Sequence, residues 1–358
     1  FNSVWSVNGS HIFSNNTGNV GIGLNNTSGK MVIKGDAGAP SGEPLFEVKN
    51  AQGQTVFVVY PDSVHIYVKD EGAKSNKGGF AVSGRNSSKA LTNDYFYVTP
   101  ENTTVWTQDT AMGFNVQAIE GAATTNYMNM TPDNYSIGYE AGLSITSGKF
   151  NSFMGFHAGR MTTAGASNTF IGYESGIANT TGSENIFLGS GSGFSNIGGT
   201  GDDGSYNVFI GNQSGYYSTT GYKNVLIGYR CGYENTTGNS NVFIGDESGR
   251  DNTTGSRNVF LGQQTGHRNG SGFANTFIGT GAGYYNDNGS NNVYLGYVSG
   301  YNNTTGSHNV FLGTETGYMN TTGAYNLFVG YQTGYHNTLG NNNLFMGYQA
   351  GYSNTTGN

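Results

Sequence analysis

The chain has 358 residues, of which 60 are Gly and 5 are Pro, and 10% are charged, against roughly 25% in ordinary globular domains. Its net charge is −7 without a run of like charge, which argues against nucleic-acid binding through a basic surface. No apolar stretch approaches the ~20 residues of a membrane-spanning helix. The chain starts at Phe1 without a signal-like segment, so we expect it to be a processed part of a longer protein.

The first region, residues 1–44, contains short apolar segments separated by glycines. Residues 17–24 and 30–35 alternate in this way and predict short strands joined by glycine turns. Residues 36–44 are rich in Gly, Pro and Ser and predict a linker.

The second region, residues 45–133, contains three loosely similar tandem units. Each unit opens with Phe-x-Val, at Phe46, Phe80 and Phe114, and later reaches a proline followed by an acidic residue. The alternating apolar residues between these points predict strands, and the proline-acid pairs predict turns. The third unit runs directly into the repeats that follow, so we expect the two regions to be continuous.

The third region, residues 134–358, is a tandem repeat with a period of seventeen. A glycine closes the apolar run of each copy, and every copy keeps this spacing from the one before it, except for one longer step between Gly189 and Gly211. This anchor glycine occurs at Gly138, Gly155, Gly172, Gly189, Gly211, Gly228, Gly245, Gly262, Gly279, Gly296, Gly313, Gly330 and Gly347. A fixed period predicts stacked repeats. We therefore expect an all-β, parallel β-solenoid of thirteen coils, each with two short strands and two turns, forming a rod of roughly 60 Å at ~4.8 Å per coil.

The three residues that directly precede the anchor glycine are mostly of the type Val-Phe-Ile and predict a strand. The outer two share one face of the strand, which we predict fills the coil. The Phe between them then points outwards, and its column is larger than the apolar patch that a soluble monomer tolerates. This predicts a homo-oligomer, with a trimer favoured. The expected interface residues are Phe170, Phe187, Phe209, Phe243, Phe260, Phe277, Phe311, Phe328 and Phe345.

Asparagine stands four positions before every anchor glycine. Identical amides stacked coil on coil can hydrogen-bond along the rod, so we predict an Asn ladder. Its members include Asn168, Asn185, Asn207, Asn224, Asn241, Asn258, Asn275 and Asn309. A second Asn ladder is predicted in the Asn-Thr-Thr-Gly turns. Those turns also match the Asn-x-Thr sequon, which leaves sugar attachment as an alternative to the turn role.

The repeat resembles a known group of fibrous proteins. Asn207-Val208-Phe209-Ile210-Gly211, followed by Ser214-Gly215, is similar to the head repeat of YadA-like trimeric autotransporter adhesins. It is still more similar to repeats of tail-fibre-like and surface fibre proteins of Bacteroidota and their phages, in which a segment like Gly-Asn-Val-Gly-Ile-Gly at 18–23 precedes the repeats. The resemblance implies a trimeric, left-handed parallel β-roll in an extracellular fibre. The period here is longer, and Phe stands where the YadA-type repeat has a small residue.

Two features are candidates for ligand binding. Asp202 and Asp203 lie where a five-residue insertion breaks the period, and a loop that interrupts a scaffold often carries function. A solvated turn is the alternative. Tyrosine recurs at one position of many coils, in a column that is a candidate for glycan contact, and the alternative is that its rings stack to stiffen the rod. The tyrosines considered for glycan contact are Tyr216, Tyr233, Tyr301 and Tyr318.

Catalytic and metal chemistry has little support in the sequence. Acidic residues two positions after the anchor glycine, such as Glu247 and Glu315, fall in separate coils, whereas a glycosidase needs two carboxylates at one cleft. The six histidines show no ligand spacing, and the position of Cys231 holds Ala, Ser or Thr in other coils, which predicts a small buried filler. We expect no catalytic residue, metal or cofactor.

These observations and the resemblance together predict a rigid adhesive rod in an extracellular fibre, located at a cell surface or on a virion. A cell-surface glycan is the candidate partner beside identical chains. A polysaccharide-degrading tail spike is the alternative. An ice-binding solenoid is a weaker alternative, suggested by the Thr-Thr pairs that repeat at the turns.

Overall fold

The computed structural model describes residues 123–357 without a gap. Before them it describes the segments 5–8, 11–14, 20–22, 31–33, 44–49, 53–60, 64–66, 80–85, 91–98, 103–105 and 114–120. All regular elements in these segments are strands. The chain divides into two compact units, Phe1–Gln108 and Asp109–Asn358. This boundary falls inside the second predicted region, so the third tandem unit belongs with the solenoid.

The first unit begins with two pairs of short strands. Strands β1 (Trp5–Asn8) and β2 (His11–Ser14) form an antiparallel pair, whereas β3 (Val20–Ile22) and β4 (Met31–Ile33) pair in parallel. Strands β3 and β4 lie in the two segments predicted to be strands, 17–24 and 30–35, whereas β1 and β2 lie before them. The expected linker at 36–44 lies outside the described residues except for its last position.

Each tandem unit is a three-stranded antiparallel meander whose first strand begins at the predicted Phe. The opening residues Phe46, Phe80 and Phe114 are evenly spaced, at twice the solenoid period. The first two meanders consist of β5 (Phe46–Lys49), β6 (Thr55–Val59) and β7 (Val64–Ile66), and of β8 (Phe80–Arg85), β9 (Leu91–Val98) and β10 (Thr103–Val105). The proline-acid turns of these two units lie outside the described residues.

The third meander starts the solenoid sheet. Strands β11 (Phe114–Glu120) and β12 (Ala123–Met130) form a hairpin, and β12 pairs antiparallel with β13 (Asn134–Ile137). The predicted turn between β12 and β13 is present, and its Thr131 hydroxyl accepts a hydrogen bond from the Asn134 N–H at 2.9 Å. From β13 onwards all pairing is parallel. The hairpin therefore occupies the strand edge that the first coil would otherwise expose.

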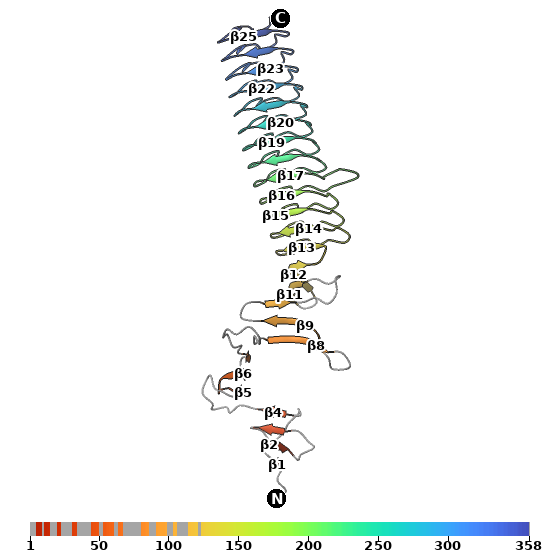
Figure 1. Cartoon of the computed structure of the whole chain (residues 1–358). Coiled ribbons are helices and arrows are strands. Elements are labelled where there is room, and N and C mark those ends of the chain that lie inside the picture. The colour runs from red at the N-terminus through yellow and green to blue at the C-terminus, as the bar shows by residue number, and fades with distance from the viewer. Residues whose placement is uncertain are drawn as a thin grey trace. The chain divides into compact units, whose positions relative to one another are not determined.

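Thirteen parallel strands form the solenoid, one above the next (Figure 1). After β13 they are β14 (Asn151–Met154), β15 (Thr169–Ile171), β16 (Ile186–Leu188), β17 (Val208–Ile210), β18 (Val225–Ile227), β19 (Val242–Ile244), β20 (Val259–Leu261), β21 (Thr276–Ile278), β22 (Val293–Leu295), β23 (Val310–Leu312), β24 (Leu327–Val329) and β25 (Leu344–Met346). Equivalent residues pair in every step, for example Phe243 with Phe260. The predicted parallel β-solenoid is confirmed.

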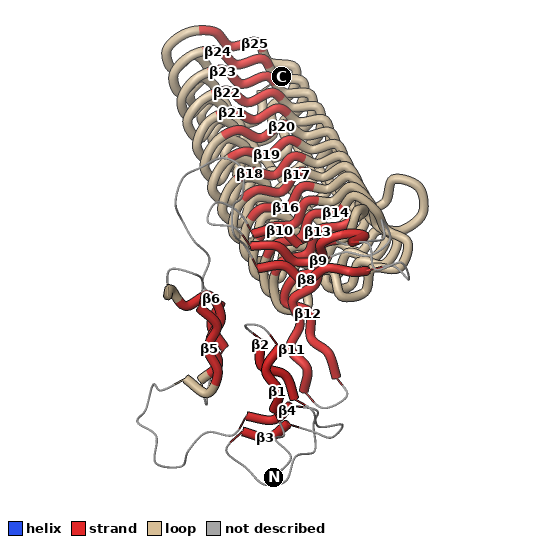
Figure 2. Tube along the Cα trace, turned by 60° about the horizontal axis from the view of Figure 1, so that its bottom comes forward, coloured by secondary structure: helices blue, strands red, loops and turns tan. Residues whose placement is uncertain are grey.

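Each coil contains one strand, and the prediction of a second near Ser-Gly-Tyr is wrong (Figure 2). The cause is the backbone conformation. In the coil of β19, Glu247 and Gly249 have φ of 52° and 56°, in the left-handed region that interrupts an extended chain. This segment still bonds from coil to coil, since the Gly249 N–H donates to the Thr265 carbonyl at 2.9 Å, but it does so as a chain of turns.

The Phe column fills the inside of the coils, so its predicted placement at an oligomer interface is wrong. Eight of the nine predicted interface phenylalanines have no exposed surface, and Phe345 in the last coil packs partly buried against the same core. The rings stack on one another, as in Phe243 on Phe260 with centroids 4.6 Å apart and planes 7° apart. The predicted Val and Ile interior is wrong for the same reason, because these residues flank Phe and face outwards.

The second glycine of the repeat explains why an aromatic ring fits inside so small a coil. A Cβ placed on Gly249 would lie 2.4 Å from the ring of Phe243, so the turn can close over the ring only without a side chain. The anchor glycine has a different constraint. A Cβ on Gly245 would lie 2.3 Å from the carbonyl oxygen of Gly262 in the next coil. The two glycines thus set the thickness of the coil and the spacing between coils.

Candidate functional site

The first Asn ladder exists, but its main bonds run from amide to backbone and not from amide to amide. The Asn241 side chain accepts from the N–H of Asn258 in the next coil at 3.0 Å and donates to the carbonyl of Gly255, at the end of its own repeat, at 2.9 Å. The same pair of bonds recurs along the column, and the eight predicted members are fully buried. Each amide therefore ties two coils together and satisfies backbone groups that the turn leaves unpaired.

The second Asn ladder forms the predicted amide-to-amide chain from Asn235 to Asn354, whereas the predicted members Asn179 and Asn196 make no bond of this kind. The Asn252 Nδ2 donates to Asn235 Oδ1 at 2.6 Å, and Asn269 Nδ2 donates to Asn252 Oδ1 at 2.7 Å. Since Asn252 is fully buried, it offers no side chain for sugar attachment in the folded protein. The same holds for the sequon residues Asn179, Asn235, Asn303 and Asn320.

The four tyrosines considered for glycan contact are half-buried members of a stacked column. Tyr216 stacks on Tyr233 with centroids 5.3 Å apart, and Tyr301 stacks on Tyr318 at 5.2 Å. Burial raises the pKa of Tyr216 and of Tyr233. Because each ring face covers the next ring, these faces are not available to stack on a sugar, and the contacts favour the alternative role of stiffening the rod.

The insertion of five residues forms a loop with one ion pair. Lys223 Nζ lies 2.5 Å from Asp202 Oδ2, with both side chains about half exposed. This hydrogen bond to Asp202 raises the pKa of Lys223. Asp203 packs back towards Gly199, where an added Cβ would lie 2.7 Å from its Oδ2. These contacts favour a solvated turn, and ligand binding by Asp202 and Asp203 stays a prediction.

The acidic side chains that follow the anchor glycine bond to their neighbours in adjacent coils. Gln264 Nε2 donates to Glu247 Oε2 at 3.0 Å, and Gln332 Nε2 donates to Glu315 Oε2 at 2.7 Å. The hydrogen bond from Gln264 lowers the pKa of Glu247. These carboxylates are thus members of a polar ladder along the rod.

The threonines of the turns are also occupied along the rod. Thr253 Oγ1 donates to the Gly270 carbonyl at 3.0 Å, and Thr304 Oγ1 donates to the Thr321 carbonyl at 3.0 Å. Both residues lie in turns and not in strands. The threonine column therefore contributes bonds between coils at a bend of the chain.

The outer face of the parallel sheet is an apolar stripe whose residues were predicted to lie inside the coil. We call it the outer sheet face and define it by Ser152 and Met154 of β14 and by the first and last residues of strands β15–β25. Its exposed members include Ile171 at 41%, Ile244 at 40% and Ile278 at 39%. The second glycine of each repeat, which makes room for the Phe ring, was the signal that could have shown which strand face is covered.

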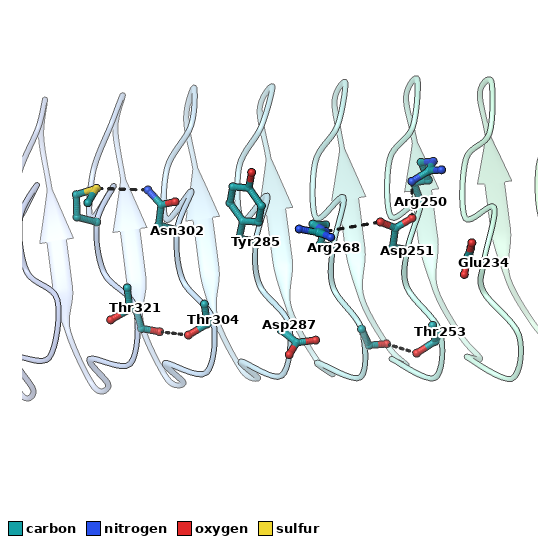
Figure 3. A pocket seen from close by; sticks show the side chains of 12 residues that line it. Glu234, Arg250, Asp251, Thr253, Arg268, Tyr285, Asp287, Asn302, Thr304 and Thr321 are labelled. Atoms are coloured by element: carbon teal, nitrogen blue, oxygen red, sulfur yellow. Dashed lines mark hydrogen bonds and ion pairs between the residues drawn. The ribbon is translucent and has the colours of Figure 1, made fainter.

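A groove of about 1060 Å³ runs along the outer surface between two rows of residues, and successive residues of a row come from successive coils (Figure 3). We call it the axial groove. Its first row consists of Glu234, Asp251, Arg268, Tyr285, Asn302 and Met319, and its second row consists of Thr253, Gly270, Asp287, Thr304 and Thr321. Arg250 also lines it. Six coils separated by five steps of about 4.8 Å make the groove about 24 Å long.

Charged residues gather at one end of the axial groove. Arg250 Nη1 donates to Asp251 Oδ1 at 2.7 Å, and the nearly buried His267 lies 3.7 Å from Asp251 Oδ2 and 3.5 Å from Glu247 Oε2. Burial lowers the pKa of His267, although Asp251 and Glu247 pull it upwards. This cluster was not predicted from the sequence, because its members occupy ordinary repeat positions and meet only when coils stack.

Comparisons of the chain with family models, with curated proteins and with solved structures found no match. Within the described segments, no helix has the length and apolarity needed to cross a membrane, and no three His, Cys, Asp or Glu side chains are grouped to hold a metal ion. The geometry defines the class of protein as a β-solenoid repeat protein of about thirteen coils.

Proposed function

We propose that this chain is the shaft of an extracellular adhesive fibre, carried on a bacterial surface or in a phage-type tail. The observation that carries the proposal is the unbroken register of twelve consecutive parallel strand pairs, from β13 to β25. Two buried Asn ladders and a stacked Phe column accompany this register. A scaffold whose coils are joined by strand pairing at every step is stiff along its axis, which is what a fibre shaft requires.

Identical chains are the partners that we propose for the outer sheet face. A strand of three residues is about 10 Å wide, and twelve steps of about 4.8 Å give about 600 Å² per chain. Exposed aromatic residues beside the sheet, such as Tyr173 and Tyr297, at 53% and 55% exposed, widen the stripe. The total approaches the ~800 Å² per partner of a stable interface.

A trimer is the assembly that we propose. Each chain presents a narrow, straight stripe, and three such stripes can meet around one axis with every coil opposite its equivalents. Parallel chains related by such an axis share the same step along the rod, so the apolar columns stay in register over their full length. Repeated weak contacts along the fibre then add through avidity.

Light scattering on the full chain tests this assembly, with Ile244→Asp as the interface variant. Because Ile244 is exposed in the single chain, the Asp variant should fold yet lose the trimer. Thr254→Asp, at an exposed turn position in the same repeat, is the matched control and should keep the trimer mass. A monomeric wild type, or an Ile244→Asp variant with unchanged mass, would contradict the proposed interface.

A further inference from the structure

The axial groove differs from the rest of the rod because the repeat departs from its usual residues there. The second row of the groove holds Thr in most coils, yet Gly270 and Asp287 occupy this position in two successive coils. A Cβ on Gly270 would lie 2.4 Å from Asp287 Oδ1. The missing side chain therefore deepens the floor and leaves room for an exposed carboxylate beside it.

One aromatic ring in the groove is turned differently from the stacked tyrosine column. Tyr285 contacts Tyr284 at an interplanar angle of 66° and Tyr301 at 85°. The stacked rings have their faces directed along the rod, so a ring nearly perpendicular to them has its plane along the rod. A ligand that lies in the groove parallel to the axis can therefore stack on Tyr285.

Arg268 supplies hydrogen-bond donors next to this ring. Its side chain is 61% exposed, and its Nε lies 3.9 Å from Asp251 Oδ2, beyond hydrogen-bond distance. Its guanidinium carbon lies 5.7 Å from the centre of the Tyr285 ring. An aromatic face, guanidinium donors and the carboxylate of Asp287 thus lie in one groove, which suits a ligand carrying many hydroxyl groups.

The groove does not suit a polyanion or an extended peptide. Three carboxylates (Glu234, Asp251 and Asp287) outnumber the guanidinium groups of Arg250 and Arg268. A peptide strand would need free backbone groups to pair with, but the groove backbone is already bonded between coils. The Thr253 N–H, for example, donates to the Gly270 carbonyl at 2.9 Å.

We infer that the axial groove binds a linear, uncharged glycan strand lying along the rod. This inference rests on the proposed adhesive function and assigns its recognition to named residues. Tyr285 stacks on a sugar ring, Arg268 donates to hydroxyl or ring oxygens, and Asp287 accepts from hydroxyl groups. The groove spans six coils, so several consecutive sugars contact the protein at once.

Isothermal titration of the full chain with cellohexaose, maltohexaose and xylohexaose tests the inference, with a galacturonic acid hexamer as the acidic probe. At least one neutral hexamer should bind, more tightly than its own disaccharide. Tyr285→Ala and Arg268→Ala should each weaken binding about tenfold. Tyr217→Ala is the matched control, because Tyr217 holds the same repeat position outside the groove and has similar edge contacts with Tyr216 and Tyr233.

Three outcomes would overturn the inference. They are failure of all three neutral hexamers to bind, binding of the acidic hexamer alone, and equal weakening by the Tyr217 and Tyr285 variants. Light scattering on the same variants separates this result from the proposed assembly. A glycan that binds a monomeric chain would contradict the trimer alone, and an intact trimer that binds no neutral glycan would contradict the groove alone.

Discussion

The two faces of each three-residue strand differ in burial and in how much their residues vary from coil to coil. In β19 the central Phe243 has no exposed surface, whereas Ile244 next to it is 40% exposed. The inner column holds Phe in most coils, and Leu226 and Tyr294 replace it in two coils in the middle of the rod. The outer column ranges from Val and Ile to Thr. The inner residues therefore determine the shape of the coil, whereas the outer residues can vary and are available for contacts between molecules.

Removing an inner ring should lower the stability of the rod more than any other substitution considered below. Phe243→Ala should lower the free energy of unfolding by about 3–5 kcal/mol, because it leaves a cavity between the side chain of Leu226 in the preceding coil and the ring of Phe260 in the next. Val242→Thr, a change on the outer face of the same strand, should cost less than about 1 kcal/mol, since Thr276 already occupies this position. Urea unfolding followed by circular dichroism measures both, and equal costs would refute the assignment of the faces.

Interrupting the second Asn ladder should have the next largest effect. Asn252→Ala removes the bonds to Asn235 and Asn269 and leaves buried amide groups unpaired, at about 2–4 kcal/mol. Asn239→Ala, in the preceding coil and partly exposed, should change stability by less than about 0.5 kcal/mol. Urea unfolding measures the free energy of unfolding of both variants. A loss for Asn252→Ala as small as that for Asn239→Ala would show that the ladder contributes little to stability.

Cys231 should give the smallest effect. Its thiol is buried and lies 3.3 Å from the Phe243 carbonyl, and Ser214 and Ser248 make the equivalent bond. Cys231→Ser should therefore cost less than about 1 kcal/mol. Burial raises the pKa of the Cys231 thiol well above its ordinary value, so iodoacetamide should leave the folded chain unlabelled at pH 8 and label it in urea.

The same pKa shift predicts a dependence on pH. Above about pH 8.5 the thiol ionises in the unfolded chain but stays protonated in the folded one. The unfolded chain then binds fewer protons, so the wild type should lose stability relative to Cys231→Ser as the pH rises from 8 to 10. A constant difference between the two, or rapid labelling of the folded chain, would contradict burial of the thiol.

Most of the architecture could be predicted because it depends on period. Regularly spaced anchor glycines and an Asn in every copy indicate stacked coils, and the three Phe-x-Val segments marked where the meanders begin. The placement of faces could not be predicted from alternation, since alternation says which residues share a face but not which face is covered. Among the candidate ligand residues, Tyr216 and Tyr233 were found by their period, but their stacking, which covers the ring faces, was visible only in three dimensions.

The sequence alone determined the repeat, its length and the residues that recur, because these are properties of spacing along the chain. The tertiary structure decided where those residues point. Gly249 leaves space above Phe243, so the ring turns inwards and the aliphatic neighbours turn outwards. It also decided that Glu234, Arg268 and Tyr285, which are separated by whole repeats, line one groove. Residues that are seventeen positions apart in the sequence become neighbours only when the coils have formed and stacked, so these contacts depend on the tertiary structure.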